Sequence, residues 1–542
     1  MAGSDVRGPL LALLYGDDAP AVGARIDHLV ARRRRPAEGV APVPGGAVWS
    51  SDDVWLITYA DQFQRPGEPP LRTLADIVDR HLEWVNGVHV LPFYPWSSDD
   101  GFSVEDYRAV DARYGTWDDV EALAEGRRFM ADAVINHMSA EGDWFARFRA
   151  GEEPYRSYFR TEAADTDTSL VVRPRTHPLL TPVETADGVR HVWTTFSADQ
   201  VDLDYASPDL FLEILDVLLD YVDRGADVLR LDAIGFLWKD PTRTSIHLPE
   251  THAAIQVMRS VLDEATPGTL LISETNVPHV ENISYLKDDP PEVHAVYQFP
   301  LAPLVAHAVL TGDVETLVAW ADSIDDVLAP GQSFLNFLAC HDGIGVRPTE
   351  GILDDAGRQV LVDACEAAGG RVSYRSVAGG GQSPYELNTT WFDLLSAGAA
   401  DDDEAIARHV ASHAVMLAMP GVAAIYVHSL FGSSNDAAGF ARTGANRQLN
   451  RERFDDLAAL EGRLADPTSR AARVMAGLGE LVAARRSSPA FHPIVPAEVT
   501  SPAPGVVRIT RRPTEGTPPA IWTINLSSSA AAGLAPYEVA IS

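Results

Sequence analysis

ADVLRLDAIG, residues 226–235, is the stretch that decides the fold of this 542-residue chain. It is a short apolar run bounded by turn or helix signals, which is typical of a fully buried parallel strand. Asp232 follows the run where the strand should end. Two other stretches repeat this plan, TLLISET (269–275) with Glu274 and SFLNFLACHD (333–342) with Asp342. The pattern therefore predicts three carboxylates at the ends of three buried strands.

Five further runs have the same strand-like character. They are VWLITYA (54–60), GVHVLPFYP (87–95), FMADAVINH (129–137), VHAVYQF (293–299) and VAAIYV (422–427). Helical patterns alternate with the strands, for example at 74–85, 117–126 and 404–418. Repeated strand–helix units predict a parallel sheet with helices outside. Eight such strands predict an α/β fold, a (β/α)8 TIM barrel, whose catalytic residues come from the C-terminal ends of several strands.

The remaining segments divide the chain around this barrel. We expect an N-terminal helical extension and linker (1–50), the first part of the barrel (51–137), an inserted subdomain B (138–205), the second part of the barrel (206–342), an inserted loop subdomain (343–402), the last part of the barrel (403–486) and a small C-terminal β domain (487–542). Residues 379–381, all Gly, indicate a flexible loop in the second insertion. VVRITRR and AIWTINLS favour strands in the tail.

The N-terminal extension has helical spacing from Pro9 to about Arg35, and it ends in a run of four arginines, 32–35. Such a run can bind nucleic acid. It also suits a helix C-terminus, where cations interact favourably with the helix dipole, and this is the interpretation we prefer. AEGVAPVPGGA (37–47) is expected to be a linker to the barrel.

Charge and cysteine content narrow the function classes. The chain has 43 basic and 77 acidic residues and a net charge of −34, which disfavours nucleic acid and anionic membranes as partners. A phosphate site would therefore be a local cationic exception. Cys340 and Cys365 are too few for a disulfide framework, and the N-terminus lacks the organisation of a secretory signal, so we expect a cytoplasmic protein. No apolar run is long enough to span a membrane. The oligomeric state stays open between monomer and homodimer.

Four short segments carry the candidate chemistry: DAVINH (132–137), VLRLDAIG (228–235), ISETN (272–276) and CHDGIG (340–345). Each is weak alone, but together and in this order they resemble the α-amylase superfamily, glycoside hydrolase family 13, over about residues 51–490. LITYADQF, FLACHDGIGVRP and NRQLNRE resemble the sucrose-phosphorylase subfamily. SSDDGFSVEDY, RPRTHPLLTP, ISETNVPHVENISYL and SPYELN are most similar to its glucosylglycerate phosphorylase branch.

The resemblance implies a role for each carboxylate. Asp232 would be the nucleophile, Glu274 the general acid/base and Asp342 the stabiliser of the transition state. Arg230 lies two residues before Asp232 and on the same side of a strand, so its guanidinium would favour the ionised carboxylate. Glu274 must start protonated, which requires a raised pKa. The alternative is a purely structural ion-pair network at the end of the barrel.

The same resemblance implies the glucosyl-binding residues. His137 and His341 would donate hydrogen bonds to sugar hydroxyls beside Arg230, and Asp99 would close the far side of the pocket. Phe196 is equally consistent with a pocket wall and with ordinary packing. Asn136 matches a calcium-binding position of many amylases, but the phosphorylase branch does not rely on calcium. We therefore expect no metal and no cofactor, with inorganic phosphate as co-substrate.

The acceptor side should distinguish phosphorolysis from hydrolysis, because a phosphate needs fixed donors such as Arg. Arg173, Arg175, Tyr385 and Arg447 match phosphate and acceptor positions, although each Arg alone would more often be a surface residue. Two positions depart from the sucrose-phosphorylase pattern. Asn276 replaces a His, and Glu386 replaces a Gln. Both departures argue against plain sucrose.

The expected activity is that of a retaining α-glucoside phosphorylase. It would convert 2-O-α-glucosyl-D-glycerate and phosphate reversibly to α-D-glucose 1-phosphate and D-glycerate by double displacement. Alternatives are a sucrose, sucrose 6F-phosphate or glucosylglycerol phosphorylase, a retaining α-glucosidase or transglucosidase, and a catalytically inactive sugar-binding barrel. An anionic acceptor would need a cation, for which Arg447, Arg451, His279 and Lys239 are candidates.

Overall fold

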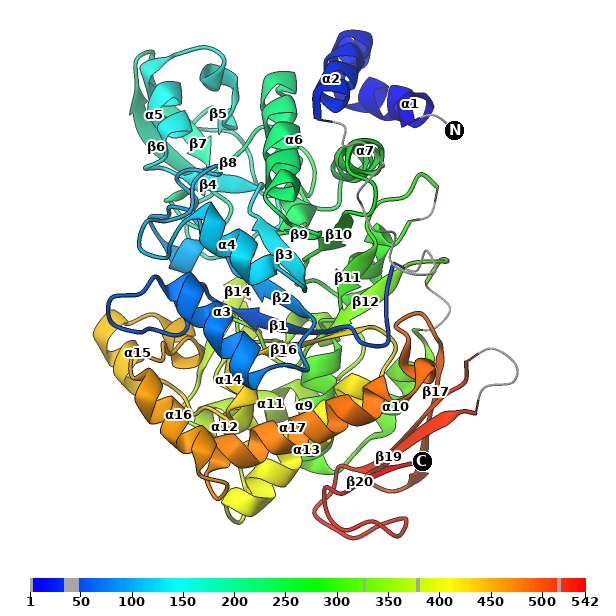
Figure 1. Cartoon of the computed structure of the whole chain (residues 1–542). Helices are drawn as coiled ribbons and strands as arrows, with labels where there is room; N and C mark the ends of the chain where they lie inside the picture. The colour runs from blue at the N-terminus through cyan, green and yellow to red at the C-terminus, as the bar shows by residue number, and fades with distance from the viewer. Residues whose placement is uncertain (1–2, 34–47, 288, 325–327, 377–380, 514–517) are drawn as a thin grey trace.

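The computed structural model describes residues 3–33, 48–287, 289–324, 328–376, 381–513 and 518–542, and its centre is a closed barrel of eight parallel strands (Figure 1). The strands are β1 (Val54–Thr58), β2 (Gly87–Val90), β3 (Arg128–Ala133), β9 (Val228–Leu231), β10 (Leu270–Ser273), β11 (Ala295–Tyr297), β12 (Ser333–Asn336) and β16 (Val422–Tyr426). Their order around the barrel is β1-β16-β12-β11-β10-β9-β3-β2. The predicted (β/α)8 fold is confirmed.

Burial on both faces explains why the strands appear as continuous apolar runs. Every residue of β1, β9, β10, β12 and β16 is buried. Inside the barrel the side chains form the core, and outside they meet a ring of helices. The helices of this ring include α3 (Pro70–His81), α4 (Trp117–Ala124), α6 (Pro208–Asp223), α7 (Pro249–Ala265), α9 (Leu301–Thr311), α10 (Glu315–Asp322), α13 (Asp402–Ala418) and α17 (Arg470–Arg486).

All eight barrel strands end before the runs predicted for them, and in two cases the difference places a site residue several positions beyond its strand. β3 ends at Ala133 rather than at 137, and β12 ends at Asn336 rather than at 342. The apolar run continues in both places because the following residues are buried in the mouth of the barrel. His137 consequently lies in β4 (His137–Ser139), which pairs with β8 (Gln200–Asp202), and Asp342 lies in a loop beyond β12.

The two insertions are more regular than the sequence indicated. The first contains α5 (Asp143–Ala150) and a sheet of β5 (Thr161–Glu162), β6 (Leu180–Thr185) and β7 (Gly188–Trp193). The expected loop region 343–402 contains β13 (Ile344–Gly345), α11 (Asp355–Ala367), β14 (Arg371–Ser376), β15 (Gln382–Asn388) and α12 (Trp391–Ser396). Of its three consecutive glycines, 379 and 380 lie outside the described residues, so the predicted flexibility stays a prediction.

The C-terminal β domain is confirmed as a four-stranded antiparallel sheet. Its strands are β17 (Ala497–Ala503), β18 (Val506–Arg511), β19 (Ala520–Asn525) and β20 (Val539–Ile541). Four further short α-helices are α8 (His279–Asn282), α14 (Val427–Leu430), α15 (Ala437–Thr443) and α16 (Leu457–Ala465). None of the helices that the structure describes has the length and apolar character needed to cross a bilayer.

The N-terminal extension forms two helices instead of the one predicted. α1 (Gly3–Tyr15) and α2 (Ala19–Arg33) are separated by a turn in which Gly16 has a φ of 52°, a conformation that glycine adopts at little cost. Figure 1 shows the pair against α7. Arg32 and Arg33 lie in the last turn of α2 and pair with Asp216 of α6. These two basic residues therefore complete a helix end, while 34–47, which include the predicted linker, lie outside the described residues.

Arg7 joins the extension to the barrel and provides a stability test. Its buried guanidinium contacts Asp27 of α2 at 2.7 Å and Glu264 of α7 at 2.9 Å. We expect Arg7→Ala to lower the free energy of unfolding by about 1.5–3 kcal/mol, because charge-assisted hydrogen bonds are lost. The matched control is Arg25→Ala, whose pair with Asp209 is exposed and should contribute at most about 1 kcal/mol. Urea unfolding of both variants measures the difference; equal losses would contradict the tethering role of Arg7.

Candidate active site

A pocket opens at the C-terminal mouth of the barrel, where the predicted site residues meet. Its walls contain Asp99, Phe102, His137, Arg175, Phe196, Gln200, Asp232, Ala233, Gly235, Phe236, Ile246, Glu274, Thr275, Asn276, Val277, His341, Asp342, Tyr385, Glu386 and Arg447. Every predicted site residue belongs to this set except Arg173 and Arg230. Arg230 lies directly beneath the pocket, in contact with Asp232. Arg173 does not line the pocket.

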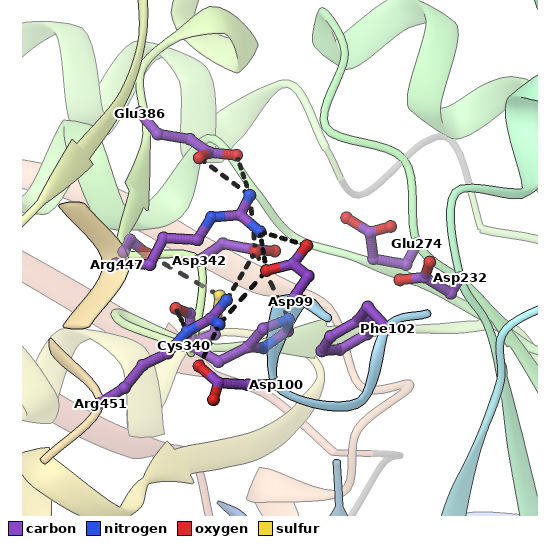
Figure 2. A network of polar contacts seen from close by, with 12 residues as sticks. Asp99, Asp100, Phe102, Asp232, Glu274, Cys340, Asp342, Glu386, Arg447 and Arg451 are labelled. Carbon is purple, nitrogen blue, oxygen red and sulfur yellow. Dashed lines mark hydrogen bonds and ion pairs between the residues drawn. The ribbon is translucent and has the colours of Figure 1, made fainter. Parts of the chain in front are cut away.

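Asp232 and Glu274 lie side by side because each follows directly after its strand in neighbouring positions of the barrel (Figure 2). Arg230 Nη1 donates to Asp232 Oδ1 at 2.9 Å, and its Nη2 lies 3.7 Å from Glu274 Oε2. The backbone N–H of Ala233 donates to Glu274 Oε2 at 3.0 Å. One guanidinium thus contacts both carboxylates and fixes their relative position.

A buried layer below the pocket holds Arg230 in place. Asp132 accepts a short hydrogen bond from Arg230, and His89 Nε2 lies 2.7 Å from the other oxygen of Asp132. The ring of Tyr297 lies 5.2 Å from the guanidinium carbon. Sequence reasoning missed these supporting residues, although Asp132 stands in the quoted segment DAVINH. The alternation of side chains on β3 and β9 could have placed it beside Arg230.

Burial and Arg230 act in opposite directions on the pKa values of the two carboxylates. Burial raises the pKa of Asp232 and of Glu274. Arg230 opposes both rises, and its hydrogen bond to Asp232 is closer than its approach to Glu274. The closer contact with Arg230 stabilises the ionised form of Asp232 more directly than that of Glu274. This difference is in the direction that an acid beside a nucleophile requires.

Asp342 faces the dyad across the pocket and is held by arginines from a distant segment (Figure 2). Arg447 contacts Asp342 at 2.9 Å, Glu386 at 3.1 Å and Asp99 at 3.3 Å. Burial alone would raise the pKa of Asp342, but Arg447 and Arg451 outweigh it and lower that pKa. Asp342 is consequently ionised, which its predicted role as transition-state stabiliser requires.

Glu386 differs from Asp342 although both contact Arg447. Burial raises the pKa of Glu386 and exceeds the opposing effect of Arg447. Arg451 lies below, where its Nε donates to the carbonyl of His341 at 2.8 Å and its Nη1 to Asp100 at 2.8 Å. Arg447 is therefore the shared cation of three carboxylates at the pocket wall, and Arg451 supports the loops behind it.

The two predicted histidines both line the pocket, and burial keeps them neutral. Burial lowers the pKa of His137 and of His341. Phe102 connects them: its carbonyl contacts His137 Nε2 at 2.9 Å, and its ring stacks on His341 at 4.5 Å. The ring centroids of Phe196 and His137 are 5.3 Å apart, and Phe196 also lines the pocket. Phe196 therefore both packs against His137 and forms part of the pocket wall. Phe102 is a pocket residue that the sequence reasoning did not assign, although it stands in the quoted motif SSDDGFS.

The other side of the pocket contains a cation that carries no ion pair within the described chain. Arg175 donates only to the carbonyl of Pro174, at 3.4 Å, and its guanidinium lies 5.4 Å from the ring of Tyr385 and 5.9 Å from that of Phe196. Asn276 also faces this side, and no described residue contacts its buried Oδ1 through a hydrogen bond. A guanidinium with no carboxylate of the described residues within 4 Å suits an anionic group of a ligand, and the unused oxygen of the Asn276 amide suits a hydroxyl that donates to it.

Several other candidate cations lie outside the pocket wall. Arg173 donates to the carbonyl of His177 at 2.5 Å, inside the first insertion. Lys239 is buried and donates to Asn136 Oδ1 at 2.8 Å, so its ammonium lies at the residue that matched a calcium ligand. His279 packs edge-on against Trp320. Arg175 lines the pocket and these three candidates do not, so the predicted anionic acceptor would contact Arg175 and not them.

Comparison with known proteins agrees with this geometry. A family model described as the catalytic domain of α-amylase matches residues 81–343. A glucosylglycerate phosphorylase of Allomeiothermus silvanus is 46% identical over 508 residues, which make up 92% of this chain and 89% of that protein. The Escherichia coli glucosylglycerate phosphorylase is 43% identical over 86% of this chain and 84% of its own length. The chain therefore belongs to the α-amylase family, and the predicted resemblance is confirmed.

Two more distant relatives place the chain among similar enzymes. A sucrose phosphorylase of Agrobacterium vitis is 30% identical over 81% of this chain and 89% of its own. The crystal structure of sucrose 6F-phosphate phosphorylase from Thermoanaerobacter thermosaccharolyticum has a TM-score of 0.77 at 23% identity, covering 90% of this chain and 96% of that one. The second likeness concerns the fold alone. The predicted order of similarity, with glucosylglycerate phosphorylases before sucrose phosphorylases, agrees with the identities.

The raised pKa of Glu274 leads to a pH prediction. Because burial raises its pKa, the acid form persists to higher pH than usual and is lost as the pH rises through that value. Transfer from a glucoside with a poor leaving group should therefore decline on the basic side. Glu274→Gln should lower this rate by about 10²–10⁴-fold.

α-D-Glucosyl fluoride provides the control, since fluoride departs without a proton. The rate of fluoride release in the first turnover should not fall at basic pH when Glu274 loses its proton. The same rate should largely survive Glu274→Gln. Asp232→Asn removes the proposed nucleophile and should abolish turnover of both donors. Equal loss of both donors in Glu274→Gln would contradict the role of general acid.

Proposed function

We propose that the protein is a retaining phosphorylase that converts 2-O-α-glucosyl-D-glycerate and phosphate reversibly to α-D-glucose 1-phosphate and D-glycerate. The observation that carries the phosphorylase assignment is Arg175, a pocket guanidinium without a carboxylate partner in the described structure. The relatives named as glucosylglycerate phosphorylases support glycerate as the acceptor. Glu386 and Asn276 line the same side, where the sequence departs from the sucrose-phosphorylase pattern.

The first step follows from the dyad. Glu274 donates its proton to the glycosidic oxygen while Asp232 attacks the anomeric carbon, so glycerate departs and a β-glucosyl ester of Asp232 forms. Asp342 stabilises the positive charge that develops on the sugar ring. His137, His341 and Asp99 lie around the space that the glucosyl group would fill. Arg447, which the sequence predicts for the phosphate and acceptor site, pairs with Asp99 at the same wall.

The second step reverses the roles. An oxygen of phosphate attacks the anomeric carbon, Glu274 accepts the proton of the phosphate, and the bond to Asp232 breaks. Two inversions give α-D-glucose 1-phosphate with net retention. Arg175 and the hydroxyl of Tyr385 would hold the phosphate beside Glu274, where an anion near a carboxylate needs compensating charge. Phosphate is a co-substrate in this scheme, and we propose no cofactor and no metal.

Location and assembly belong to the same proposal. The two cysteines of the sequence, Cys340 and Cys365, are both buried and unpaired, which fits a reducing cytoplasm. The ligands would be small molecules, a glucoside and phosphate. The protein would act as a monomer or a homodimer, which size-exclusion chromatography with light scattering decides.

An acceptor screen tests the substrate assignment. The enzyme is incubated with α-D-glucose 1-phosphate and D-glycerate, fructose, fructose 6-phosphate or glycerol, and released phosphate is measured. D-Glycerate should give the highest kcat/KM. Preference for fructose 6-phosphate or fructose would favour a sucrose 6F-phosphate or sucrose phosphorylase instead. Glucose release that is independent of phosphate and of every acceptor would overturn the phosphorylase assignment in favour of a hydrolase.

Arg175 provides the matching test of the phosphate site. Arg175→Ala should raise the KM for phosphate by about 10–100-fold, because a charge-assisted hydrogen bond contributes about 1.5–3 kcal/mol. The control is Arg190→Ala, which removes an exposed arginine from the same insertion. Hydrolysis of α-D-glucosyl fluoride should change little in either variant. An unchanged KM for phosphate in Arg175→Ala would refute this role.

A further inference from the structure

A cluster of four serines surrounds one carboxylate at the edge of the active site. Asp199 Oδ2 accepts hydrogen bonds from Ser97 at 2.6 Å and Ser103 at 2.7 Å, and a shorter one from Ser98. Ser139 contacts the other oxygen at 3.3 Å. Three of the four serines belong to the loop between β2 and α4, whereas Asp199 lies just before β8 in the first insertion. The carboxylate therefore ties the insertion to the barrel loop.

The loop that carries these serines has an unusual backbone. Asp99, Asp100 and Gly101 have φ values of 51°, 50° and 108° in succession. Such a conformation costs a non-glycine residue roughly 1–2 kcal/mol and persists only where its surroundings impose it. At Gly101 a Cβ would lie 2.5 Å from the carbonyl oxygen of Pro92, so only glycine fits. The strained turn projects Asp99 into the pocket beside Arg447 (Figure 2).

Two clamps hold the turn in this conformation. On one side Arg451 and Gln448 donate to Asp100 at 2.8 Å and 3.0 Å. On the other side, Asp199 accepts hydrogen bonds from Ser97 and Ser98 before the turn and from Ser103 after it. The backbone N–H of Ser97 also donates to the carbonyl oxygen of Ser103 at 3.1 Å. The first clamp holds the tip of the turn, whereas the second holds its two ends.

The serines that contact Asp199 also neighbour Phe102 and His137, two residues that line the pocket. Phe102 lies between Gly101 and Ser103, stacks on His341 and accepts a hydrogen bond from His137 in its neutral form. Ser139, two residues after His137, contacts Asp199 as well. A movement of Asp199 would therefore displace Asp99 and Phe102 together, and misplacement by about 1 Å can cost on the order of 100-fold in rate.

We propose that Asp199 is a positioning residue for the glucosyl-binding side of the active site, acting through the Ser97–Ser103 loop on Asp99. It does not line the pocket. A carboxylate suits this position because one oxygen accepts from three hydroxyls, whereas an asparagine would present an NH₂ donor to one set of serines. Those hydrogen bonds act against partial burial and lower the pKa of Asp199, which keeps it an acceptor.

The experiment compares Asp199→Asn with Asp187→Asn, a matched change at an exposed turn of the same insertion, where Asp187 pairs with Arg156. First-turnover fluoride release from α-D-glucosyl fluoride is measured. This readout needs neither glycerate nor phosphate, so it survives if the phosphorylase assignment fails. We expect Asp199→Asn to lower kcat/KM by about 10–100-fold, mainly through KM, and Asp187→Asn to stay within about twofold.

A double-mutant cycle with Asp99→Asn separates positioning from general destabilisation. If Asp199 acts through Asp99, Asp199→Asn should change kcat/KM by less than about threefold once Asp99 is replaced. Independent effects that multiply in the double variant, or an unchanged kcat/KM in folded Asp199→Asn, would overturn the proposal. Should Asp199→Asn fail to fold, Ser97→Ala and Ser98→Ala remove its loop-side donors singly, and the same cycle applies to them.

Discussion

The active site depends on one buried cation, Arg230. Its guanidinium is 1% exposed and contacts Asp132, Asp232 and Glu274. Burying these charges would be costly for each alone, and it is tolerated because they are paired in one network. The same cation lies closer to Asp232 than to Glu274, and this contact stabilises the ionised carboxylate that the proposed nucleophile requires.

The pocket is a local exception to the charge of the whole protein. The chain carries a net charge of −34, yet Arg175, Arg447 and Arg451 converge on the barrel mouth. Arg447 is occupied by three carboxylates, whereas Arg175 is stacked on aromatic rings. In the proposed function, the ion pairs of Arg447 hold Asp99 and Asp342 in place, and Arg175 supplies positive charge for an anionic ligand.

The barrel provides a rigid frame, and the segments inserted into it complete the site. β9 and β10 present the dyad directly, but Arg175 and Asp199 come from the first insertion, and Glu386 comes from the second. The loop around Asp99 is strained on its own and holds its shape only between the first insertion and the segment that contains Arg451. Substrate specificity in such an arrangement can change while the catalytic pair stays in place.

Local patterns in the sequence determined the barrel and the dyad. Buried strands appear as continuous apolar runs, and Asp232 and Glu274 follow directly after two of them, so their meeting was predictable from the geometry of a parallel barrel. Asp342 was predicted as a strand end but lies in a loop, because an apolar run shows burial and not the extent of a hydrogen-bonded strand. Tertiary structure alone decided the rest. Arg447 meets Asp99 across 348 positions, and Arg175 faces the pocket while Arg173 does not. Loops have no periodicity from which a side chain's direction follows, so only the packing of distant segments sets it.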